Sequence, residues 1–240
     1  MKYMGSKNRF AKEILPIILK DREPEQYYTE LFAGGMNTID KVTGNRIAND
    51  IHTELIEMWK ALVYDGWLAP TEISRETYKM IKDKKQNYEP WLVGWTGFNC
   101  SYSGKYFGGY AGRTKTKLGT IRDYQLEARK NTYKQVENLK GVVFVNDEYN
   151  KVKIPENSII YCDPPYENTT KYSNDFNHIL FWDFVREKSK QGHKVYVSEY
   201  NAPKDFVCVW QKEAKSSLSA NGVIGKSKTS VEKLFVYNGY

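Results

Sequence analysis

The segment Asp163-Pro164-Pro165-Tyr166 has the residue types and order that most specifically indicate chemistry. It follows residues 158–162, an apolar run typical of a strand buried on both faces. Two consecutive prolines lack backbone donors, so they should fix the chain and leave the Asp163 carboxylate and Pro164 carbonyl as acceptors. Two acceptors beside the ring of Tyr166 suit a planar group with an exocyclic NH2, on which the tyrosine can stack. The structural alternative is a rigid turn that binds nothing.

The pair Gly34-Gly35 is a second candidate, because it follows a strand expected over residues 26–33. Glycines in a first βα turn let a ligand approach the backbone. The third glycine of GxGxxG is missing, which counts against NAD or FAD. Asp50 ends the next expected strand, where an acidic side chain can accept hydrogen bonds from ribose hydroxyls. Asp50 is equally compatible with capping the helix that follows it.

These residues need a sheet that brings strand ends together. Periodicity predicts helices at 8–20, 53–64, 70–85, 90–98, 121–139 and 176–191, and strands at 26–33, 46–48, 142–145, 158–162, 194–200, 206–211 and 233–237. Alternation of strands with helices predicts an α/β fold with a mostly parallel sheet and helices on both faces. Gly35 and Asp163 are 128 positions apart, which is more than two or three further βα units need. Residues 66–140 should therefore form a helical and loop insert. The rest, residues 1–65 and 141–240, should form one catalytic domain.

The net charge of +7 over 240 residues is unevenly distributed. Residues 1–100 are neutral, 101–140 carry +6, 141–185 carry −4 and 186–240 carry +5. Two basic segments on either side of an acidic one predict a polyanion-binding surface. Residues 99–120 contain five glycines, four Tyr or Phe and four Lys or Arg without an acidic residue, which indicates a basic, aromatic loop.

The cysteines and histidines offer little for other mechanisms. Cys100, Cys162 and Cys208 form no CxxC pair, and the three histidines are equally scattered, so we expect no metal site and no disulfide framework. No apolar run is long enough to span a membrane, and the first ten residues contain no apolar leader. We therefore expect a cytoplasmic protein. We also expect a monomer or weak dimer, although no residue pattern specifies this.

Five segments in order resemble the Dam-type, D12-class DNA adenine-N6 methyltransferases of bacteria and phages. The resemblance covers nearly the whole chain. The matching segments are residues 2–7 (KYMGSK), 30–35 (ELFAGG), 48–50 (AND), 163–166 (DPPY) and the closing stretch 216–238. The family implies a Rossmann-like class I methyltransferase sheet, S-adenosylmethionine as cofactor and double-stranded DNA as partner. It also implies that residues 66–140 form a target-recognition insert.

The resemblance implies a role for each matching residue. Catalysis would rest on Asp163, Pro164, Pro165 and Tyr166, which hold the N6 amino group and stack on a flipped adenine. Cofactor binding would involve Tyr3, Lys7, Phe32, Ala33, Gly34, Asp50, Glu148, Tyr149 and Asp163. DNA contacts are expected from Lys2, Tyr102, Tyr110, Arg113, Lys115, Lys117, Ser217, Ser219, Asn221 and Lys226.

Other classes of function remain alternatives at this point. An RNA adenine methyltransferase would present the same basic surface, because RNA and DNA share phosphates. A protein-glutamine methyltransferase with the related N-P-P-Y segment is disfavoured by Asp163 and by the basic insert. A DNA-binding regulator without activity is disfavoured by the intact DPPY segment, since binding alone does not need its acceptors.

Overall fold

The computed structural model describes residues 1–116, 118–167, 176–215 and 229–239. These residues form two compact units. Unit 1 comprises Met1–Lys12 and Ala33–Val152, and unit 2 comprises Glu13–Phe32 and Lys153–Tyr240. The DPPY segment therefore belongs to unit 2, whereas Gly34, Gly35 and Asp50 belong to unit 1. Residues 66–140, the predicted insert, lie within unit 1. That they form a separate domain stays a prediction.

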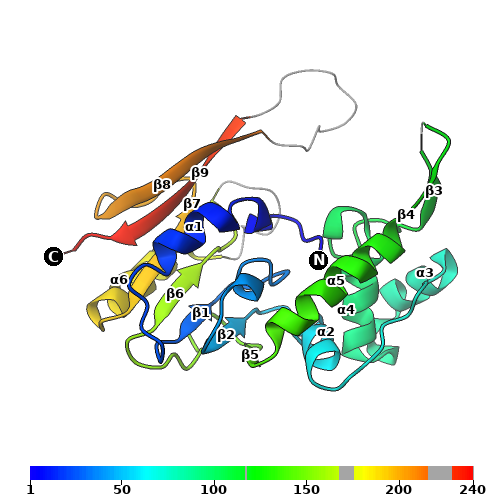
Figure 1. The fold of residues 1–240 in the computed structure, drawn as a ribbon, viewed down its shortest axis with the longest axis horizontal. Coiled ribbons are helices and arrows are strands. Elements are labelled where there is room, and N and C mark those ends of the chain that lie inside the picture. Colours follow the sequence, from blue (N-terminus) through cyan, green and yellow to red (C-terminus); the bar gives the residue numbers. More distant parts are fainter. Residues whose placement is uncertain (117, 168–175, 216–228, 240) are drawn as a thin grey trace. The chain divides into compact units, whose positions relative to one another are not determined.

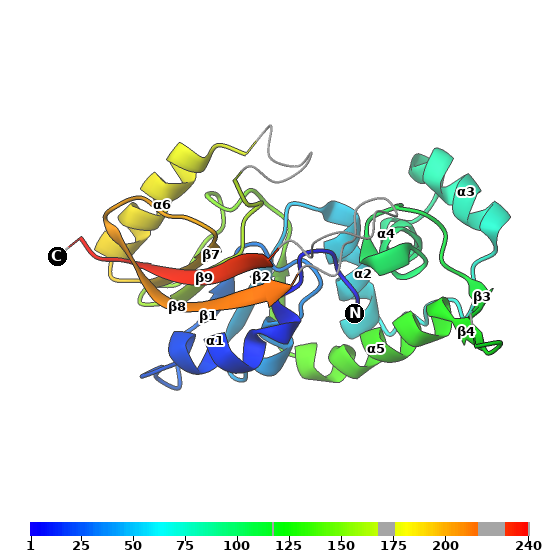
Figure 2. The same cartoon turned by 90° about the horizontal axis from the view of Figure 1, so that it is seen from above.

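Unit 2 is a five-stranded sheet with helices (Figure 1). Its elements are α1 (Ala11–Ile18), whose first two residues belong to unit 1, β1 (Tyr28–Glu30), β6 (Ile159–Cys162), α6 (His178–Lys190), β7 (Lys194–Glu199), β8 (Phe206–Lys215) and β9 (Thr229–Tyr237). The strand order is β1-β6-β7-β9-β8, with β1, β6 and β7 parallel and β9 antiparallel to both of its neighbours. Figure 2 shows α1 and α6 on opposite sides of these strands.

Unit 1 combines a parallel strand pair with a group of helices. Its elements are η1 (Lys7–Arg9), η2 (Ile39–Lys41), β2 (Arg46–Asn49), α2 (Thr53–Val63), α3 (Arg75–Asp83), η3 (Lys85–Asn87), α4 (Pro90–Asn99), η4 (Tyr102–Gly104), β3 (Arg113–Lys115), β4 (Ile121–Asp123), α5 (Tyr124–Leu139) and β5 (Val142–Val145). β2 and β5 are parallel, and the antiparallel hairpin β3–β4 extends from the N-terminal end of α5 (Figure 1). With the parallel strands of unit 2, this confirms the predicted α/β fold.

The core of unit 1 depends on a close approach of α2 and α4. Trp59 on α2 is fully buried, and Trp95 on α4 is 2% exposed. A Cβ on Gly94 would lie 2.0 Å from the backbone carbonyl oxygen of Glu54. The helices can therefore pack this closely only because residue 94 has no side chain.

Several element boundaries differ from the predicted ones for local reasons. The helix expected at 121–139 begins at Tyr124, because the Asp123 side chain accepts a hydrogen bond from the Leu126 N–H (2.9 Å) and caps it. Residues 121–123, expected to begin that helix, instead pair with residues 113–115, which were expected to be loop, and the two segments form a hairpin. β8 continues to Lys215, because β9 supplies a pairing partner from Thr229 onward. The strand expected at 26–33 is only Tyr28–Glu30.

Arg46 joins the start of β2 to the end of α5. Its side chain is buried, and Nη1 and Nη2 donate to the carbonyls of Asn138 and Lys140, both at 2.7 Å. Nε donates to the Gly44 carbonyl at 3.2 Å. These donors satisfy carbonyls at the C-terminus of a helix, where a cation is also favoured by the helix dipole.

Replacing Arg46 with Met should therefore lower the free energy of unfolding by about 2–4 kcal/mol, since buried carbonyls lose charged donors. Urea denaturation measures this value. The matched control is Lys140→Met, because Lys140 Nζ forms an ion pair with the exposed Glu137 and with no other side chain in the described ranges. The control should cost about 0–1 kcal/mol, and equal losses in both variants would contradict the assigned role of Arg46.

Candidate active site

The DPPY segment lies at the carboxyl end of β6, an interior strand of unit 2. β6 pairs in parallel with β1 on one side and β7 on the other, and all four of its residues are buried. The Leu31 N–H continues this pairing by donating to the Tyr161 carbonyl at 3.1 Å. Asp163 is the first residue beyond the strand and is partly exposed. This is the edge at which ligands of open α/β sheets bind.

Tyr166 contacts Glu232 on β9 and Tyr200, the residue just after β7. Its hydroxyl donates to Glu232 Oε2 on β9 at 2.9 Å, and Glu232 is itself 7% exposed. Its ring lies 4.6 Å from the ring of Tyr200 at an angle of 84°, an edge-to-face contact. Burial, and then the charges of Asp163 and Glu232, raise the pKa of Tyr166 well above its ordinary value. The hydroxyl therefore remains a donor, and the plane of the ring is fixed.

Glu199 ties the DPPY turn to the end of β7. The side chain is 2% exposed. Its Oε2 accepts from the Glu167 N–H at 3.1 Å, and its Oε1 accepts from the Tyr200 N–H at 2.7 Å. Two buried carboxylates, Glu199 and Glu232, thus hold the residues directly after the two prolines.

Sequence reasoning did not assign Glu199 or Glu232 to the site. Glu232 lies in the closing stretch that resembles the family, and this resemblance is the sequence signal that could have indicated its role. Glu199 stands at the end of an apolar strand, and only the pairing of β7 with its neighbours brings it to the turn.

The thiol beside the turn is not a nucleophile at neutral pH. Cys162 is fully buried, and this burial, with the charges of Asp163 and Glu30, raises the pKa of its thiol far above the ordinary value. The thiolate is the reactive form. The chemistry of the turn must therefore come from its oxygen atoms and from Tyr166.

In unit 1 the Gly34-Gly35 turn lies against the ring of Tyr3. Gly34 has φ +47°, and a Cβ there would lie 2.6 Å from Tyr3 Cε1. A Cβ on Gly35 would lie 2.6 Å from both Tyr3 Cβ and Asn37 Nδ2. Two residues that the sequence assigned to one site, Tyr3 and Gly34, are therefore neighbours. Side chains at positions 34 and 35 would disturb this contact.

Asp50 organises the same turn. Its Oδ2 accepts from the Gly34 N–H at 2.9 Å, and its Oδ1 accepts from the His52 N–H at 2.9 Å. The helix-cap alternative is wrong, because the N-cap of α2 is His52. Burial raises the pKa of the Asp50 carboxyl, while the two backbone donors act in the opposite direction. Each oxygen has further acceptor capacity beyond its single backbone bond.

The ends of β2 and β5 are joined by asparagines. The Asn49 side chain donates to the Asp147 carbonyl and accepts from the Asp147 N–H, both at 3.0 Å. Asn146 Nδ2 donates to the Asp50 carbonyl at 2.8 Å. The predicted cofactor residues Glu148 and Tyr149 follow directly. Glu148 is exposed and accepts from Lys151 Nζ at 2.8 Å, and Tyr149 is partly buried.

His52 starts an aromatic cluster that sequence reasoning did not include. Its ring lies 5.1 Å from Phe98 and 4.3 Å from Tyr106, and Phe98 lies 5.6 Å from Tyr3. The Tyr106 hydroxyl donates to Glu54 Oε1 at 3.2 Å. Burial lowers the pKa of His52, so its imidazole is neutral at pH 7. This apolar cluster backs the ring of Tyr3.

The other predicted cofactor residues have different surroundings. Lys7 is 8% exposed, and its Nζ donates to the Gly5 carbonyl at 3.4 Å. Ala33 is buried, and its N–H donates to the Asn49 carbonyl at 2.8 Å. Phe32, in unit 2, makes edge-to-face contacts with Phe176 and Phe181 at 5.8 and 5.9 Å.

The predicted DNA contacts of the hairpin region already have partners in the protein. Arg113 Nε donates to Asp123 Oδ2 at 3.0 Å across β3–β4, and Lys2 Nζ lies 3.3 Å from Glu127. Tyr110 donates to the Ile73 carbonyl at 2.9 Å. Tyr102 is 44% exposed and contacts Tyr124, and Lys115 is exposed. Lys117, Ser217, Ser219, Asn221 and Lys226 lie outside the described residues.

The described ranges contain no group of three or more His, Cys, Asp or Glu side chains arranged to hold a metal ion. In the same ranges, every helix is too short or too polar to span a membrane.

Comparison with known proteins identified a family and individual relatives. A family model described as D12 class N6 adenine-specific DNA methyltransferase matches residues 3–92 and 71–230. The Type II methyltransferase M.FokI of Planomicrobium okeanokoites is 24% identical over 214 residues, which are 78% of this chain and 32% of that protein. The chain thus spans about a third of the length of this relative. The crystal structure of SMU.472 complexed with SAH aligns over 100% of this chain and 54% of its own, with 9% identity and a TM-score of 0.38.

The hydrogen bonds of Glu199 predict the effect of replacing it. Glu199→Gln keeps one acceptor oxygen but places an NH2 group against an amide donor, so one buried N–H loses its partner. The free energy of unfolding should fall by about 1–3 kcal/mol, and the amide of Glu167 or Tyr200 should exchange hydrogen faster. Urea denaturation and native-state hydrogen exchange measure these effects. Glu213→Gln on exposed β8 is the control. Unchanged exchange at both amides would show that Glu199 does not hold the turn.

Proposed function

Because the chain belongs to the D12 class N6 adenine-specific DNA methyltransferase family, we propose that it transfers a methyl group from S-adenosylmethionine to adenine N6 in double-stranded DNA. The observation that carries this proposal is the DPPY turn at the carboxyl end of β6, with Tyr166 fixed by Glu232 and Tyr200. The cofactor, the DNA substrate and the site residues are all part of the proposal.

The DPPY turn would receive the target base. An adenine inside a duplex must rotate out of the helix to reach a protein pocket, at a cost of roughly a few kcal/mol. The Asp163 carboxylate and the Pro164 carbonyl would accept the two N6 hydrogens, which localises the nitrogen lone pair and orients it. Pro165 limits the motion of the turn. Tyr166 would stack on the base through the small part of its ring that is exposed, 8% of the residue.

The unit 1 residues fit the chemistry of S-adenosylmethionine. This cofactor would supply a methyl group activated by its sulfonium. Gly34 and Gly35 present backbone without side chains, Asp50 has acceptor capacity for ribose hydroxyls, and the Tyr3 ring covers the turn. Lys7 is the cation assigned to the cofactor carboxylate, while Ala33, Glu148 and Tyr149 would line the binding site. Positioning of two reactants and electrostatics would account for most of the rate enhancement.

DNA would be held by the basic segments on either side of the acidic one. Lys115 on β3 and Lys117, two positions further along the sequence, are proposed phosphate contacts, and Tyr102 is exposed enough to stack on a base. Arg113 and Lys2 would have to exchange their carboxylate partners for DNA, and Tyr110 its carbonyl partner. Ser217, Ser219, Asn221 and Lys226 complete the proposed set.

The proposed function predicts that purified protein transfers labelled methyl from S-adenosylmethionine to adenine N6 in duplex DNA. Asp163→Ala should lower kcat by about 100-fold or more, since it removes one of two groups that orient the amine. The affinity for DNA should change by only a few-fold. Asp183→Ala, an exposed aspartate of the same unit, is the matched control and should retain full activity.

Three results would contradict this account. Label that enters RNA or protein but never DNA would replace it with one of the alternatives. Binding of DNA without any transfer would indicate a regulator. Turnover by Asp163→Ala near that of the unchanged protein would show that the DPPY carboxylate does not carry the reaction.

The raised pKa of Asp50 predicts a pH dependence of cofactor affinity. Ribose hydroxyls bind the ionised carboxylate, and burial makes that form harder to reach in the free protein. The affinity for S-adenosylhomocysteine should therefore be full at neutral pH and fall as the pH drops through the pKa of Asp50. Calorimetric titrations at a series of pH values from neutral downward measure it.

Asp50→Asn is the control for this pH dependence. Asparagine cannot ionise, so the variant should bind weakly at every pH, and the decrease at low pH should be smaller. His52 and Glu54 are the titratable neighbours that remain in the variant. The same pH profile in both proteins would assign the dependence to them and remove Asp50 from the cofactor site.

A further inference from the structure

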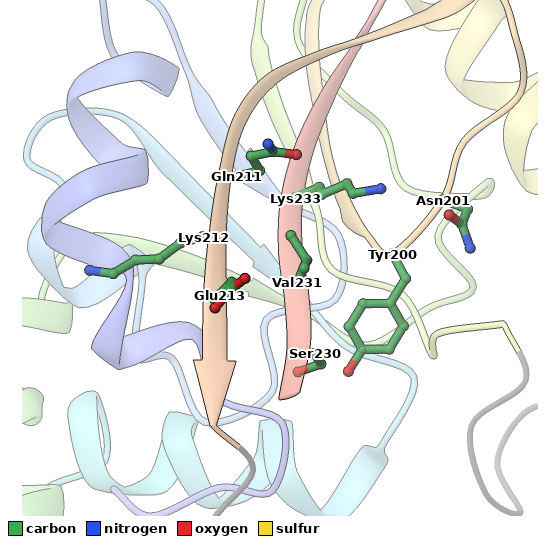
Figure 3. A pocket seen from close by; sticks show the side chains of 8 residues that line it. All are labelled: Tyr200, Asn201, Gln211, Lys212, Glu213, Ser230, Val231 and Lys233. Atoms are coloured by element: carbon green, nitrogen blue, oxygen red, sulfur yellow. The ribbon is translucent and has the colours of Figure 1, made fainter. Parts of the chain in front are cut away.

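A groove of about 700 Å³ lies beside the end of β7, over β8 and β9 (Figure 3). Its lining residues are Tyr200, Asn201, Gln211, Lys212, Glu213, Ser230, Val231 and Lys233. All of them belong to unit 2. The groove shares a wall with the DPPY turn, because Tyr200 is also the ring that packs 4.6 Å from Tyr166.

The groove combines an aromatic ring, amides and an ammonium group. Tyr200 is partly exposed, so its ring can offer a surface for stacking. Asn201 and Gln211 carry amides, and Lys233 carries a positive charge. Aromatic rings bind bases without regard to sequence, and lysines and amides bind phosphates. The set therefore suits one nucleotide of a nucleic acid strand better than an apolar ligand.

The two lysines of the groove differ in a way that makes them a matched pair. Lys212 forms an ion pair with Glu13 of α1, and Figure 3 shows its side chain directed away from Tyr200. Lys233 extends toward Asn201 in the same view. Lys233 has no ion pair with any residue in the described ranges, and its Nζ lies 6.0 Å from the Phe235 ring. Only Lys233 is therefore placed and available to bind an anion in the groove.

We propose that this groove binds the nucleotide next to the target adenine, with its base on Tyr200 and its phosphate on Lys233. The proposal rests on the proposed function, because Tyr166 is the residue to which the flipped base is assigned. Enzymes that flip a base also contact the nucleotides on either side of it. A neighbour joined by one phosphodiester cannot lie far from Tyr166, and Tyr200 is in contact with that residue.

The first test compares Lys233→Met with Lys212→Met in binding to a duplex that the unchanged protein methylates. Loss of one phosphate contact should reduce the slope of log affinity against log salt by about 0.9. We expect this reduction for Lys233→Met and the unchanged slope for Lys212→Met. Equal slopes in all three proteins would overturn the assignment of Lys233.

The second test pairs protein variants with an altered substrate. An abasic site placed on the 5′ or the 3′ side of the target adenine removes the base that Tyr200 should bind. The unchanged protein and Tyr200→Phe should lose about tenfold in kcat/KM on one of the two abasic duplexes. Tyr200→Ala should be about tenfold weaker on the intact duplex and lose nothing further on the abasic one. If Tyr200→Ala acts only by disturbing Tyr166, its kcat/KM should fall about tenfold further on the abasic duplex, as that of the unchanged protein does. Such additive losses would overturn the subsite.

The two proposals fail in distinguishable ways. If the unchanged protein methylates no DNA, the proposed function fails, and the subsite fails with it. If it methylates DNA but neither abasic duplex is impaired, the groove is not a nucleotide site and the proposed function stands.

Discussion

Hydrogen bonds that two buried glutamates, Glu199 and Glu232, accept from Glu167 and Tyr166 are the interaction on which the DPPY turn depends. Two prolines remove backbone donors from the turn, so few of its own groups can fix it to the sheet. Glu199 instead accepts from the Glu167 amide just after the turn and from the Tyr200 amide just after β7, and Glu232 accepts from the Tyr166 hydroxyl. Neighbouring strands thereby hold the residues that follow the prolines. The buried oxygen atoms of both glutamates that face the turn therefore have hydrogen-bond donors.

A similar device organises unit 1. The Asp50 carboxylate accepts a hydrogen bond from the Gly34 amide. The acidic residue just after β2 therefore fixes the Gly34-Gly35 turn. The Tyr3 ring occupies the space that side chains at residues 34 and 35 would fill. In both units, a carboxylate that could be taken for a ligand group also shapes the backbone beside it. Substitutions at Asp50 therefore affect the turn as well as any hydroxyl that it binds.

The sequence was sufficient to predict local features and insufficient for those set by strand pairing. The DPPY turn after a buried strand and the helix after Asp50 follow from residue types within a few positions. The role of Glu199 depends on parallel pairing of β6 with β7, whose residues are more than 30 positions apart, and no local pattern specifies it. The pairing of Arg113 with Asp123 is likewise set by the register of the β3–β4 hairpin, so residue type alone predicts only a phosphate contact for Arg113. Residues 216–228, which carry several predicted DNA contacts, lie outside the described ranges.

The central claim is that the turn after β6 receives an adenine rotated out of the duplex, and fluorescence of 2-aminopurine at the target position measures this most directly. The probe is quenched while it is stacked in DNA and brightens when it leaves the stack. We predict a large rise in emission when the protein and S-adenosylhomocysteine are added to a duplex whose adenine the protein methylates. The same probe one helical turn away should not respond. Full binding of that duplex with no rise at the target position would contradict the account.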